Sequence, residues 1–409
     1  MVVYADFHIH SKYALAVSKD NDLDHLAKYS DMKGLNVIGT GDFTHPLWFK
    51  SLAELKQIED TGFYSYKDYK VKFAYTVEVA TFDSTKRVHH VIHAPNREAA
   101  AQLNDVLGKR SKLASDGRPM LAKTTCAELV EMCKNVDSQM HVVAAHVWTP
   151  YFGALGALSG FNSMQDAYGD KAGKVLGIET GMSSTPQMNW RVKSLDDFAI
   201  MSGSDCHSYY LHRIGRECNA FSDDCDTYSK LFKAVAQGDK SKFLYTIETD
   251  PGYGKYHLSG HANCKFSCSY EESKKLNGIC PVCHKKLTVG VENRVEELAV
   301  RSVDYVDKNR VPFRVTLPLT DLIASALGVA LTVKKVGLIQ DALIAKFGTE
   351  FNIVFNADLK EIEKITGDVV ANAIRLNRDE KIKVTPGYDG LYGVLQLDKK
   401  EDISQTKLF

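Results

Sequence analysis

Histidine and carboxylate side chains follow several apolar segments in the first half of the chain. His8 and His10 flank one residue after the first apolar run, and Asp205 and His207 repeat that spacing after a later run. Alternate residues of a strand point to one face, so each pair can reach a single ion. Imidazole suits zinc, manganese and iron, and carboxylates can bridge two ions. The pattern predicts a polynuclear metal site, which in an open cleft usually performs hydrolysis, most often of phosphate esters.

Taken alone, either pair is equally well explained by residues hydrogen-bonded in a core. The recurrence of such groups at the ends of further apolar segments favours metal binding. We expect the chemistry-bearing positions at the carboxyl ends of strands to be His8, His10, Asp42, Glu78, His146, Glu179, Asp205 and His207.

Short β-branched runs alternate with amphipathic segments up to about residue 250. The expected strands are Val2–Ile9, Leu35–Thr40, Val71–Ala80, Arg87–Ala94, His141–Ala145, Val175–Glu179, Phe198–Ser202 and Lys242–Glu248. The expected helices are Leu23–Lys33, Pro46–Ile58, Arg97–Arg110, Ala127–Asn135 and Cys225–Gln237. This alternation predicts a parallel sheet covered by helices, and about seven strands fit an α/β barrel. An open doubly wound sheet is the alternative. The barrel is favoured because its strand ends share one face, where distant polar residues meet.

The length of 409 residues allows two or three domains, and a composition of 44% apolar and 25% charged residues is typical of a soluble globular protein. A formal net charge of zero excludes a globally basic nucleic-acid binder but leaves room for a local basic patch. No apolar run reaches the roughly 20 residues of a membrane span. The N-terminus lacks the features of a secretion signal, so we expect a cytoplasmic protein.

Three regions are expected along the chain. Residues 1–250 form the α/β domain. Residues 251–290 are rich in Gly, Cys, His and Lys, with six lysines against two acids. Residues 291–409 read as a mostly helical, DNA-binding domain, with the clearest helix over Asp358–Asn377 and a hairpin within Lys381–Leu397.

The middle region contains four cysteines with the spacing of a structural zinc site. Cys264 and Cys268 precede the knuckle Cys280-Pro-Val-Cys283. Possible substitute ligands are His257, His261 and His284. A set of small buried thiols is the simpler alternative. Four protein ligands leave no open position, so such a site would be a scaffold. The lysines around it either contact phosphates or form a solvated face.

These motifs resemble the polymerase-and-histidinol-phosphatase (PHP) superfamily. The matching strings are Phe7-His8-Ile9-His10-Ser11, Gly39-Thr40-Gly41-Asp42-Phe43-Thr44-His45, Val77-Glu78-Val79, His89-His90-Val91-Ile92, Ala145-His146 and Gly203-Ser204-Asp205-Cys206-His207. The resemblance implies a distorted α/β barrel with two or three metals that hydrolyses phosphate esters. It implies one metal held by His8, His10, Glu78 and Asp205. It implies a second metal held by Glu78, His89 and His146, and a third served by His45 and His207.

Two positions depart from the superfamily pattern or leave it ambiguous. Phe43 and Thr44 separate Asp42 from His45, so Asp42 is either a ligand or a residue that orients one. His89 and His90 face opposite sides of a strand, and we choose His89 as the ligand.

Nearly the whole chain is similar to the endonuclease Q family, most clearly in the first 300 residues. The strings that carry this are Thr40-Gly41-Asp42-Phe43-Thr44-His45-Pro46, Ile178-Glu179-Thr180-Gly181, Gly254-Lys255-Tyr256-His257, Gly260-His261, Cys280-Pro-Val-Cys283, Arg294-Val-Glu-Glu-Leu-Ala299 and Thr385-Pro-Gly-Tyr-Asp-Gly390. The resemblance implies a repair enzyme that nicks DNA on the 5′ side of deoxyuridine, deoxyinosine and abasic sites. We expect two or three divalent metals (zinc, manganese or magnesium) and one structural zinc. The expected catalytic carboxylates are Asp205, Glu78 and Asp42, and the expected substrate-binding residues are Glu179, Asn189 and Trp148.

Two other functions remain alternatives. One is a small-molecule phosphatase of the PHP superfamily, which would not need the zinc segment and the long C-terminal region. The other is a non-catalytic DNA-repair binding module, which would not need a nearly complete ligand set. Damaged DNA is the expected partner. A sliding clamp is a further candidate, because Gln405-Thr-Lys-Leu-Phe409 loosely resembles a clamp-binding peptide.

Overall fold

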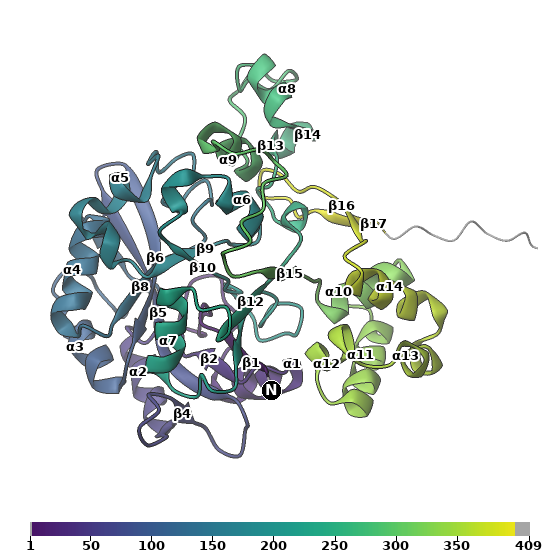
Figure 1. The fold of residues 1–409 in the computed structure, drawn as a ribbon, viewed down its shortest axis with the longest axis horizontal. Coiled ribbons are helices and arrows are strands. Elements are labelled where there is room, and N and C mark those ends of the chain that lie inside the picture. The colour runs from purple at the N-terminus through teal and green to yellow at the C-terminus, as the bar shows by residue number, and fades with distance from the viewer. Residues whose placement is uncertain (1, 397–409) are drawn as a thin grey trace, which may run out of the picture.

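The first part of the chain folds around a curled, mixed sheet of 13 strands (Figure 1). The computed structural model describes residues 2–396. Along its main path the sheet contains, in spatial order, β10 (Ala199–Met201), β9 (Gly177–Glu179), β8 (His141–Ala144), β6 (Lys86–Ala94), β5 (Lys72–Asp83), β2 (Val37–Gly39), β1 (Val2–Asp6), β11 (Cys218–Ser222), β12 (Phe243–Glu248) and β15 (Phe313–Val315). The short strands β3 (Lys56–Gln57), β4 (Tyr64–Ser65) and β7 (Met120–Ala122) lie off this path.

The sheet is an open, distorted barrel. Strands β1, β2 and β5 pair in parallel, as do β8, β9 and β10. Between these groups β6 is antiparallel to both of its neighbours. In the described part of the chain β10 and β15 end the path without pairing with each other. The α/β class is therefore confirmed, with the barrel curled and not fully closed. Strand β11 was not predicted, because its five residues are almost wholly buried and show no alternation.

Helices cover the outside of the sheet (Figure 1). They are α1 (Leu23–Lys33), α2 (Pro46–Ser51), α3 (Arg97–Leu107), α4 (Cys126–Val136), α5 (Met164–Tyr168), α6 (Pro186–Trp190) and α7 (Tyr228–Gln237). Helix α1 has the predicted bounds, because Asp22 caps its first turn and Gly34 adopts the left-handed conformation that ends it. Helix α4 begins with a capping box, in which the side chains of Thr125 and Glu128 each bind the backbone N–H of the other residue.

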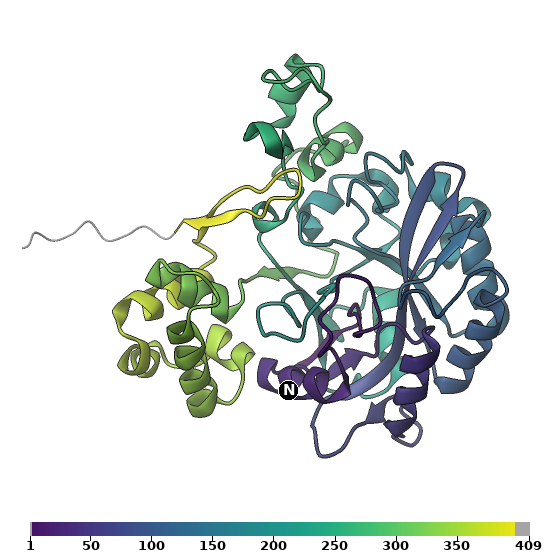
Figure 2. The same ribbon diagram turned by 180° about the vertical axis from the view of Figure 1, so that it is seen from behind.

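The segment after β12 projects from the rest of the molecule (Figures 1 and 2). It contains β13 (Ser259–His261), the antiparallel β14 (Phe266–Cys268) and α8 (Tyr270–Lys275). Helix α9 (Val291–Leu298) follows and contacts both α8 and β13. A small apolar cluster of Cys268, Cys280 and Leu287 forms the core of the projecting segment.

A helical region and a hairpin complete the described chain, as predicted. The elements are α10 (Leu319–Leu327), α11 (Lys334–Phe347), α12 (Glu350–Phe355), α13 (Leu359–Thr366), α14 (Asp368–Arg378), β16 (Lys383–Thr385) and β17 (Val394–Gln396). The single helix expected over Asp358–Asn377 is wrong. It is interrupted at Gly367, whose φ of 81° lies outside the helical region. A buried ion pair of 2.7 Å between Lys33 and Glu350 joins α1 to α12. Among the described helices none is long and apolar enough to cross a membrane.

Candidate functional site

Two groups of potential metal ligands meet at the strand ends. The first consists of His8, His10, Glu78 and Asp205, and the second of Glu78, His89 and His146. Within each group the candidate ligand atoms lie within 4.8 Å of one another. Glu78 belongs to both, so the two groups share one carboxylate. Residues almost 200 positions apart thus converge as the sequence predicted. His8, His10, His146 and Asp205 follow the ends of β1, β8 and β10, whereas Glu78 and His89 lie within the long strands β5 and β6.

His8 is held by a carboxylate on its far side. Its Nδ1 lies 2.8 Å from Oε2 of Glu179, at the end of β9. Its buried Nε2 points toward Asp205 and Glu78, at 3.6 and 3.8 Å, and has no hydrogen-bond partner among residues 2–396. The contact with Glu179 requires glycine at position 203, because a Cβ there would lie 2.6 Å from Oε1 of Glu179.

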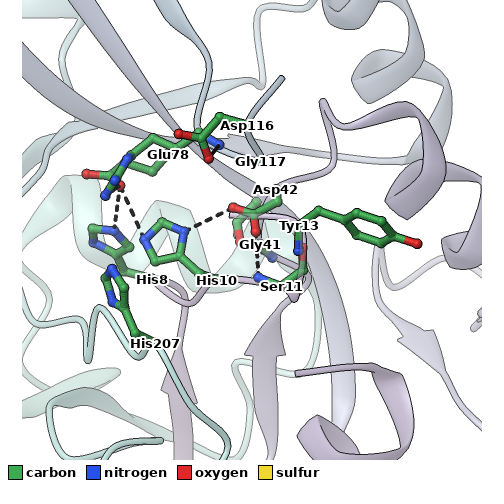
Figure 3. Close-up of polar contacts among 12 residues, drawn as sticks. His8, His10, Ser11, Tyr13, Gly41, Asp42, Glu78, Asp116, Gly117 and His207 are labelled. Carbon is green, nitrogen blue, oxygen red and sulfur yellow. Dashed lines mark hydrogen bonds and ion pairs between the residues drawn. The ribbon is translucent and has the colours of Figure 1, made fainter. Parts of the chain in front are cut away.

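His10 is held in the same way by Asp42 (Figure 3). Its Nδ1 lies 3.0 Å from Oδ1 of Asp42, while its Nε2 lies 3.1 Å from Asp205 and 3.3 Å from Glu78. The other oxygen of Asp42 accepts the backbone N–H of Ser11 at 2.5 Å. Asp42 therefore lies behind His10, on the side away from Asp205 and Glu78. This is the position of a residue that orients a metal ligand.

The second group is built on the antiparallel pair β5 and β6. Oε1 of Glu78 lies 2.5 Å from Nδ1 of His89 and 3.1 Å from Nε2 of His146. His90 points to the opposite face, where it contacts the hydroxyls of Thr81 and Tyr168. The choice of His89 over His90 thus agrees with the geometry.

Burial and close opposite charges shift the pKa values of these groups. Burial opposes ionisation of Glu78, but His89, His10, His146 and His8 outweigh it and hold the pKa of the carboxyl well below its usual value. Burial also disfavours the charged form of His8, yet Glu179, Glu78 and Asp205 raise the pKa of the imidazole well above 6.5. The pKa of His10 is raised likewise, against burial, by Asp42, Asp205 and Glu78.

The donor set fits divalent cations. Buried His8 Nε2 and His146 Nδ1 have no hydrogen-bond partner in the described chain. His8 and His10 each direct one ring nitrogen to Glu78 and Asp205 and the other to an orienting carboxylate, which is the usual environment of a metal-binding histidine. Mixed imidazole and carboxylate ligands suit zinc, manganese or iron.

Some predicted site residues lie elsewhere. His45 stacks on Tyr13 at a ring distance of 4.4 Å and belongs to neither ligand group. His207 is also outside both groups, although its ring lies 4.8 Å from that of His10. The side chain of His207 is 36% exposed at the mouth of the site, near Asp205. The structure thus does not bring His45 and His207 together as ligands of a third metal.

The predicted substrate-binding residues have three different positions. Glu179 contacts the cavity but orients His8. Trp148 lines the cavity and donates its indole N–H to Oδ1 of Asn189 at 2.7 Å. Asn189 is fully buried, and its amide donates to Ser184 and to the backbone of Thr185. The prediction for Asn189 is corrected: it supports Trp148 from behind the cavity wall.

A cavity of about 560 Å³ opens over both ligand groups. Residues that the sequence reasoning missed line its walls: Arg118, Arg213, Arg216, Lys255 and Tyr392. Arg118 lies 3.3 Å from Glu78. The only local signal for this wall was the Arg-x-x-Arg spacing soon after the Asp-x-His motif.

The cysteine segment brings together a different set of ligands from the one predicted. His261, Cys264, Cys280 and Cys283 offer atoms within 4.8 Å of one another. Cys268 lies at the far end of β14, opposite Ser259, and is buried in the apolar cluster. The fourth position is therefore occupied by His261, whose Nδ1 lies 3.0 Å from Sγ of Cys264.

The candidate clamp-binding peptide Gln405–Phe409 lies outside the described residues.

Comparison with known proteins places the chain among nucleases. It is 32% identical to a lesion-specific endonuclease from Pyrococcus furiosus, whose crystal structure superposes with a TM-score of 0.87 over 98% of both chains. It is 31% identical to an endonuclease Q that was crystallised with a 27-mer duplex carrying an abasic lesion at the active site, with a TM-score of 0.88 over 100% of both chains.

Two further matches concern parts of the chain. A curated relative, the protein MJ0043 of Methanocaldococcus jannaschii, is 34% identical over 238 residues, or 57% of this chain. The match spans 29% of the length of that relative. Residues 318–381 match the family described as the MJ0043 C-terminal domain.

Proposed function

This chain belongs to the endonuclease Q family, and on that premise we propose that it is a metal-dependent endonuclease that cuts DNA at damaged nucleotides. The observation that carries the proposal is the pair of ligand groups that share Glu78 beneath an open cavity. A paired cation site of this kind suits the in-line displacement at a phosphodiester.

We propose that the two groups hold one divalent cation each, with Glu78 as the bridge. Zinc, manganese or magnesium bound there would lower the pKa of coordinated water, to about 7 in the case of zinc, and would offset the charge of the phosphate. Asp205, whose side chain is 35% exposed at the mouth of the site, is placed to accept the proton of the attacking water. We propose that His207, whose Nδ1 lies 3.6 Å from Oδ1 of Asp205 and whose side chain is 36% exposed, takes that proton from the Asp205 carboxyl and releases it to solvent.

The cavity has the size of a pocket for one extruded nucleotide, since pockets for small ligands occupy about 300–1,000 Å³. Phe152 and Tyr256 line it and offer aromatic faces for a base. Extruding a deaminated base or an abasic residue costs less than extruding a normal paired base, because damaged nucleotides pair and stack poorly. We propose deoxyuridine, deoxyinosine and abasic sites as substrates, with cutting on their 5′ side.

We propose that His261 and the three cysteines beside it bind one structural zinc. Four protein ligands leave no open position for a substrate, so this ion would hold residues 251–290 in shape. These residues and the C-terminal helices are proposed to extend the DNA-binding surface beyond the cavity.

The test is a cutting assay on end-labelled duplexes. Matched duplexes carry uracil, hypoxanthine, an abasic site or no lesion, and are incubated with manganese or magnesium. The expected result is a single nick 5′ to each lesion, with a 3′-hydroxyl end, and no cutting of the undamaged duplex. Asp205→Asn, which keeps the shape of the side chain, should remove the activity.

The same preparation is tested on nitrophenyl phosphate. Turnover of this ester without nicking of any lesion duplex would instead identify a small-molecule phosphatase. Binding of lesion DNA without any cutting, over a range of metals, would identify a binding module. Wild-type cutting by Asp205→Asn would refute the assigned site.

A further inference from the structure

One wall of the cavity is strongly basic and is assembled from three distant parts of the chain. Arg213 and Arg216 lie in the loop before β11, Lys255 follows β12, and Tyr392 lies in the loop between β16 and β17. Among residues 2–396 no carboxylate forms an ion pair with Arg213, Arg216 or Lys255. The wall therefore presents three cations that no carboxylate contacts directly, while Glu217 and Asp205 attract Arg216, and Asp321 attracts Arg213, at longer range.

Arg216 is the buried member of this wall. It is only 7% exposed, and its Nε donates to the backbone oxygen of Ser204 at 3.1 Å. Its Nη1 is buried and has no hydrogen-bond partner in the described chain. A buried N–H group of a guanidinium without an acceptor is costly, so this atom is a candidate donor to a bound anion. Since Ser204 precedes Asp205, this anion would lie beside the first ligand group.

Tyr392 holds the other two cations in place. Arg213 donates from Nη1 to the hydroxyl oxygen of Tyr392 at 2.9 Å, and Lys255 Nζ lies 4.7 Å from the centre of the ring. Burial opposes ionisation of Tyr392, but Arg216, Arg213 and Lys255 lower the pKa of the phenol below its usual value. The lowered pKa reflects a positive potential across the wall, in agreement with the geometry.

The wall is preformed because backbone hydrogen bonds fix the loop that carries Tyr392. Gly387 donates to the oxygen of Gly252 at 2.8 Å, Gly390 to that of Lys255 at 3.0 Å and Gly393 to that of Tyr253 at 3.1 Å. A Cβ on Gly393 would collide with the oxygen of Gly252, so glycine is required for this close approach. The C-terminal hairpin is thus fastened to the segment that carries Lys255.

We propose that Arg213, Arg216 and Lys255 form a subsite for a phosphodiester, and that its occupant is the backbone phosphate next to the scissile one on the damaged strand. Two guanidinium forks and an ammonium suit phosphate oxygens, which accept charge-assisted hydrogen bonds from both. The subsite shares its cavity with the two ligand groups, so a strand that presents one phosphate to the metals brings a neighbour to this wall. This inference rests on the proposed function. It adds that the wall fixes the position of the damaged strand along the site, and so determines which phosphodiester linkage lies over Glu78.

The test combines a charge-neutral linkage with variants of the wall. Lesion duplexes carry a single methylphosphonate at successive linkages on either side of the lesion. Binding is measured as a function of salt in a Glu78→Gln background, which prevents cutting. The variants are Arg213→Gln and Lys255→Gln, with Tyr392→Phe to remove the hydroxyl alone. The matched control is Lys233→Gln, on the exposed face of α7.

Each of Arg213→Gln and Lys255→Gln should reduce the slope of log K against log salt by about 0.9, because each removes one phosphate contact. At one linkage the methylphosphonate should lower the DNA affinity of the parent protein but not that of these two variants, because they have already lost the contact with that phosphate. At all other linkages the two losses should add. Tyr392→Phe should lower DNA affinity, and the effect of a methylphosphonate at that same linkage should be smaller in this variant than in the parent. Lys233→Gln should have the affinity and the salt slope of the parent on every duplex.

Three outcomes would overturn the subsite. The variants would keep the parental salt slope, or they would lose affinity equally at every linkage. Alternatively, inorganic phosphate would compete with DNA in the parent alone while no linkage showed coupling, which would identify a free-phosphate site. In any of these cases, cutting of lesion DNA by the protein without the Glu78→Gln change leaves the proposed function intact. Failure to distinguish lesion DNA from undamaged DNA would remove both proposals.

Discussion

The two clusters of potential metal ligands are built in opposite ways. The cluster at the strand ends draws its members from residues between His8 and Asp205 and lies under a cavity of about 560 Å³. The cysteine cluster draws all four members from the short stretch between His261 and Cys283. One is assembled by the topology of the sheet, and the other by the local path of the chain.

The difference explains why only the strand-end cluster needs orienting residues. Glu179 fixes the ring of His8, and Asp42 fixes the ring of His10. In the cysteine segment the turns themselves place the ligands, with Lys265 and His284 in the left-handed conformation beside Cys264 and Cys283. The strand-end cluster is an open site that can bind substrate. The cysteine cluster is a closed site that stabilises the shape of the chain.

Removal of the shared carboxylate should have the largest effect. Glu78→Gln takes one ligand from both groups of the strand-end cluster and keeps the shape of the side chain. Lewis-acid catalysis is worth several kcal/mol, so nicking should fall by at least about 1,000-fold. Single-turnover cutting of an abasic duplex measures the loss, and circular dichroism checks the fold. A loss below tenfold would mean that Glu78 does not link the two groups.

Weakening an orienting residue should have an intermediate effect. Asp42→Asn keeps an acceptor near His10 but removes the charge, and changes behind a metal ligand lower metal affinity or activity by about 10–100-fold. The rate should recover as the metal concentration rises, because the ligands themselves remain. Glu179→Gln should behave in the same way through His8. A rate that stays low at saturating metal would show that Asp42 acts on the substrate directly.

Acidification should affect the strand-end cluster through proton competition. The pKa values of His8 and His10 are raised well above 6.5, and a metal binds imidazole only after the proton has left. At limiting metal, the apparent metal affinity should fall by about tenfold per pH unit for each proton displaced as the pH is lowered from 8 to 6. Cutting rates measured over that range at limiting and saturating metal check this. If saturating metal did not restore the rate at pH 6, the protons would be acting on another group.

The strand-end cluster could be predicted from the sequence because its signals are local. His8 and His10 follow β1 at a spacing of two, and Asp205 and His207 repeat it, so strand geometry alone suggests the face they share. Helix α1 was predicted to the residue for the same reason, since Asp22 and Gly34 mark its ends. Patterns within a few residues report which way a side chain points.

The basic wall could not be predicted, because apart from the spacing of Arg213 and Arg216 it depends on contacts between distant parts of the chain. Arg213 and Tyr392 are 179 positions apart, and only the folded hairpin brings them together. The ligand set of the cysteine cluster was also only partly predictable, because the structure has His261 where the spacing predicted Cys268. The spacing of the cysteines was informative, but the pairing of β13 with β14 decided which side chain faced the others.

Disruption of the cysteine cluster should have the smallest effect on cutting. Cys280→Ser removes a central ligand, whose pKa is held at about 7, against burial, by the backbone N–H groups of Cys283 and Val282. Because a structural zinc contributes directly to folding, residues 251–290 should become sensitive to limited proteolysis. The cutting rate at saturating DNA should fall by less than the tenfold expected for Asp42→Asn, because the strand-end ligands stay in place. Zinc content should drop by one ion per chain, with the remaining ions still exchangeable for manganese. A loss of activity as large as that of Glu78→Gln, with an intact fold, would mean that the cysteine cluster acts in the reaction and that the contrast between an open and a closed site does not hold.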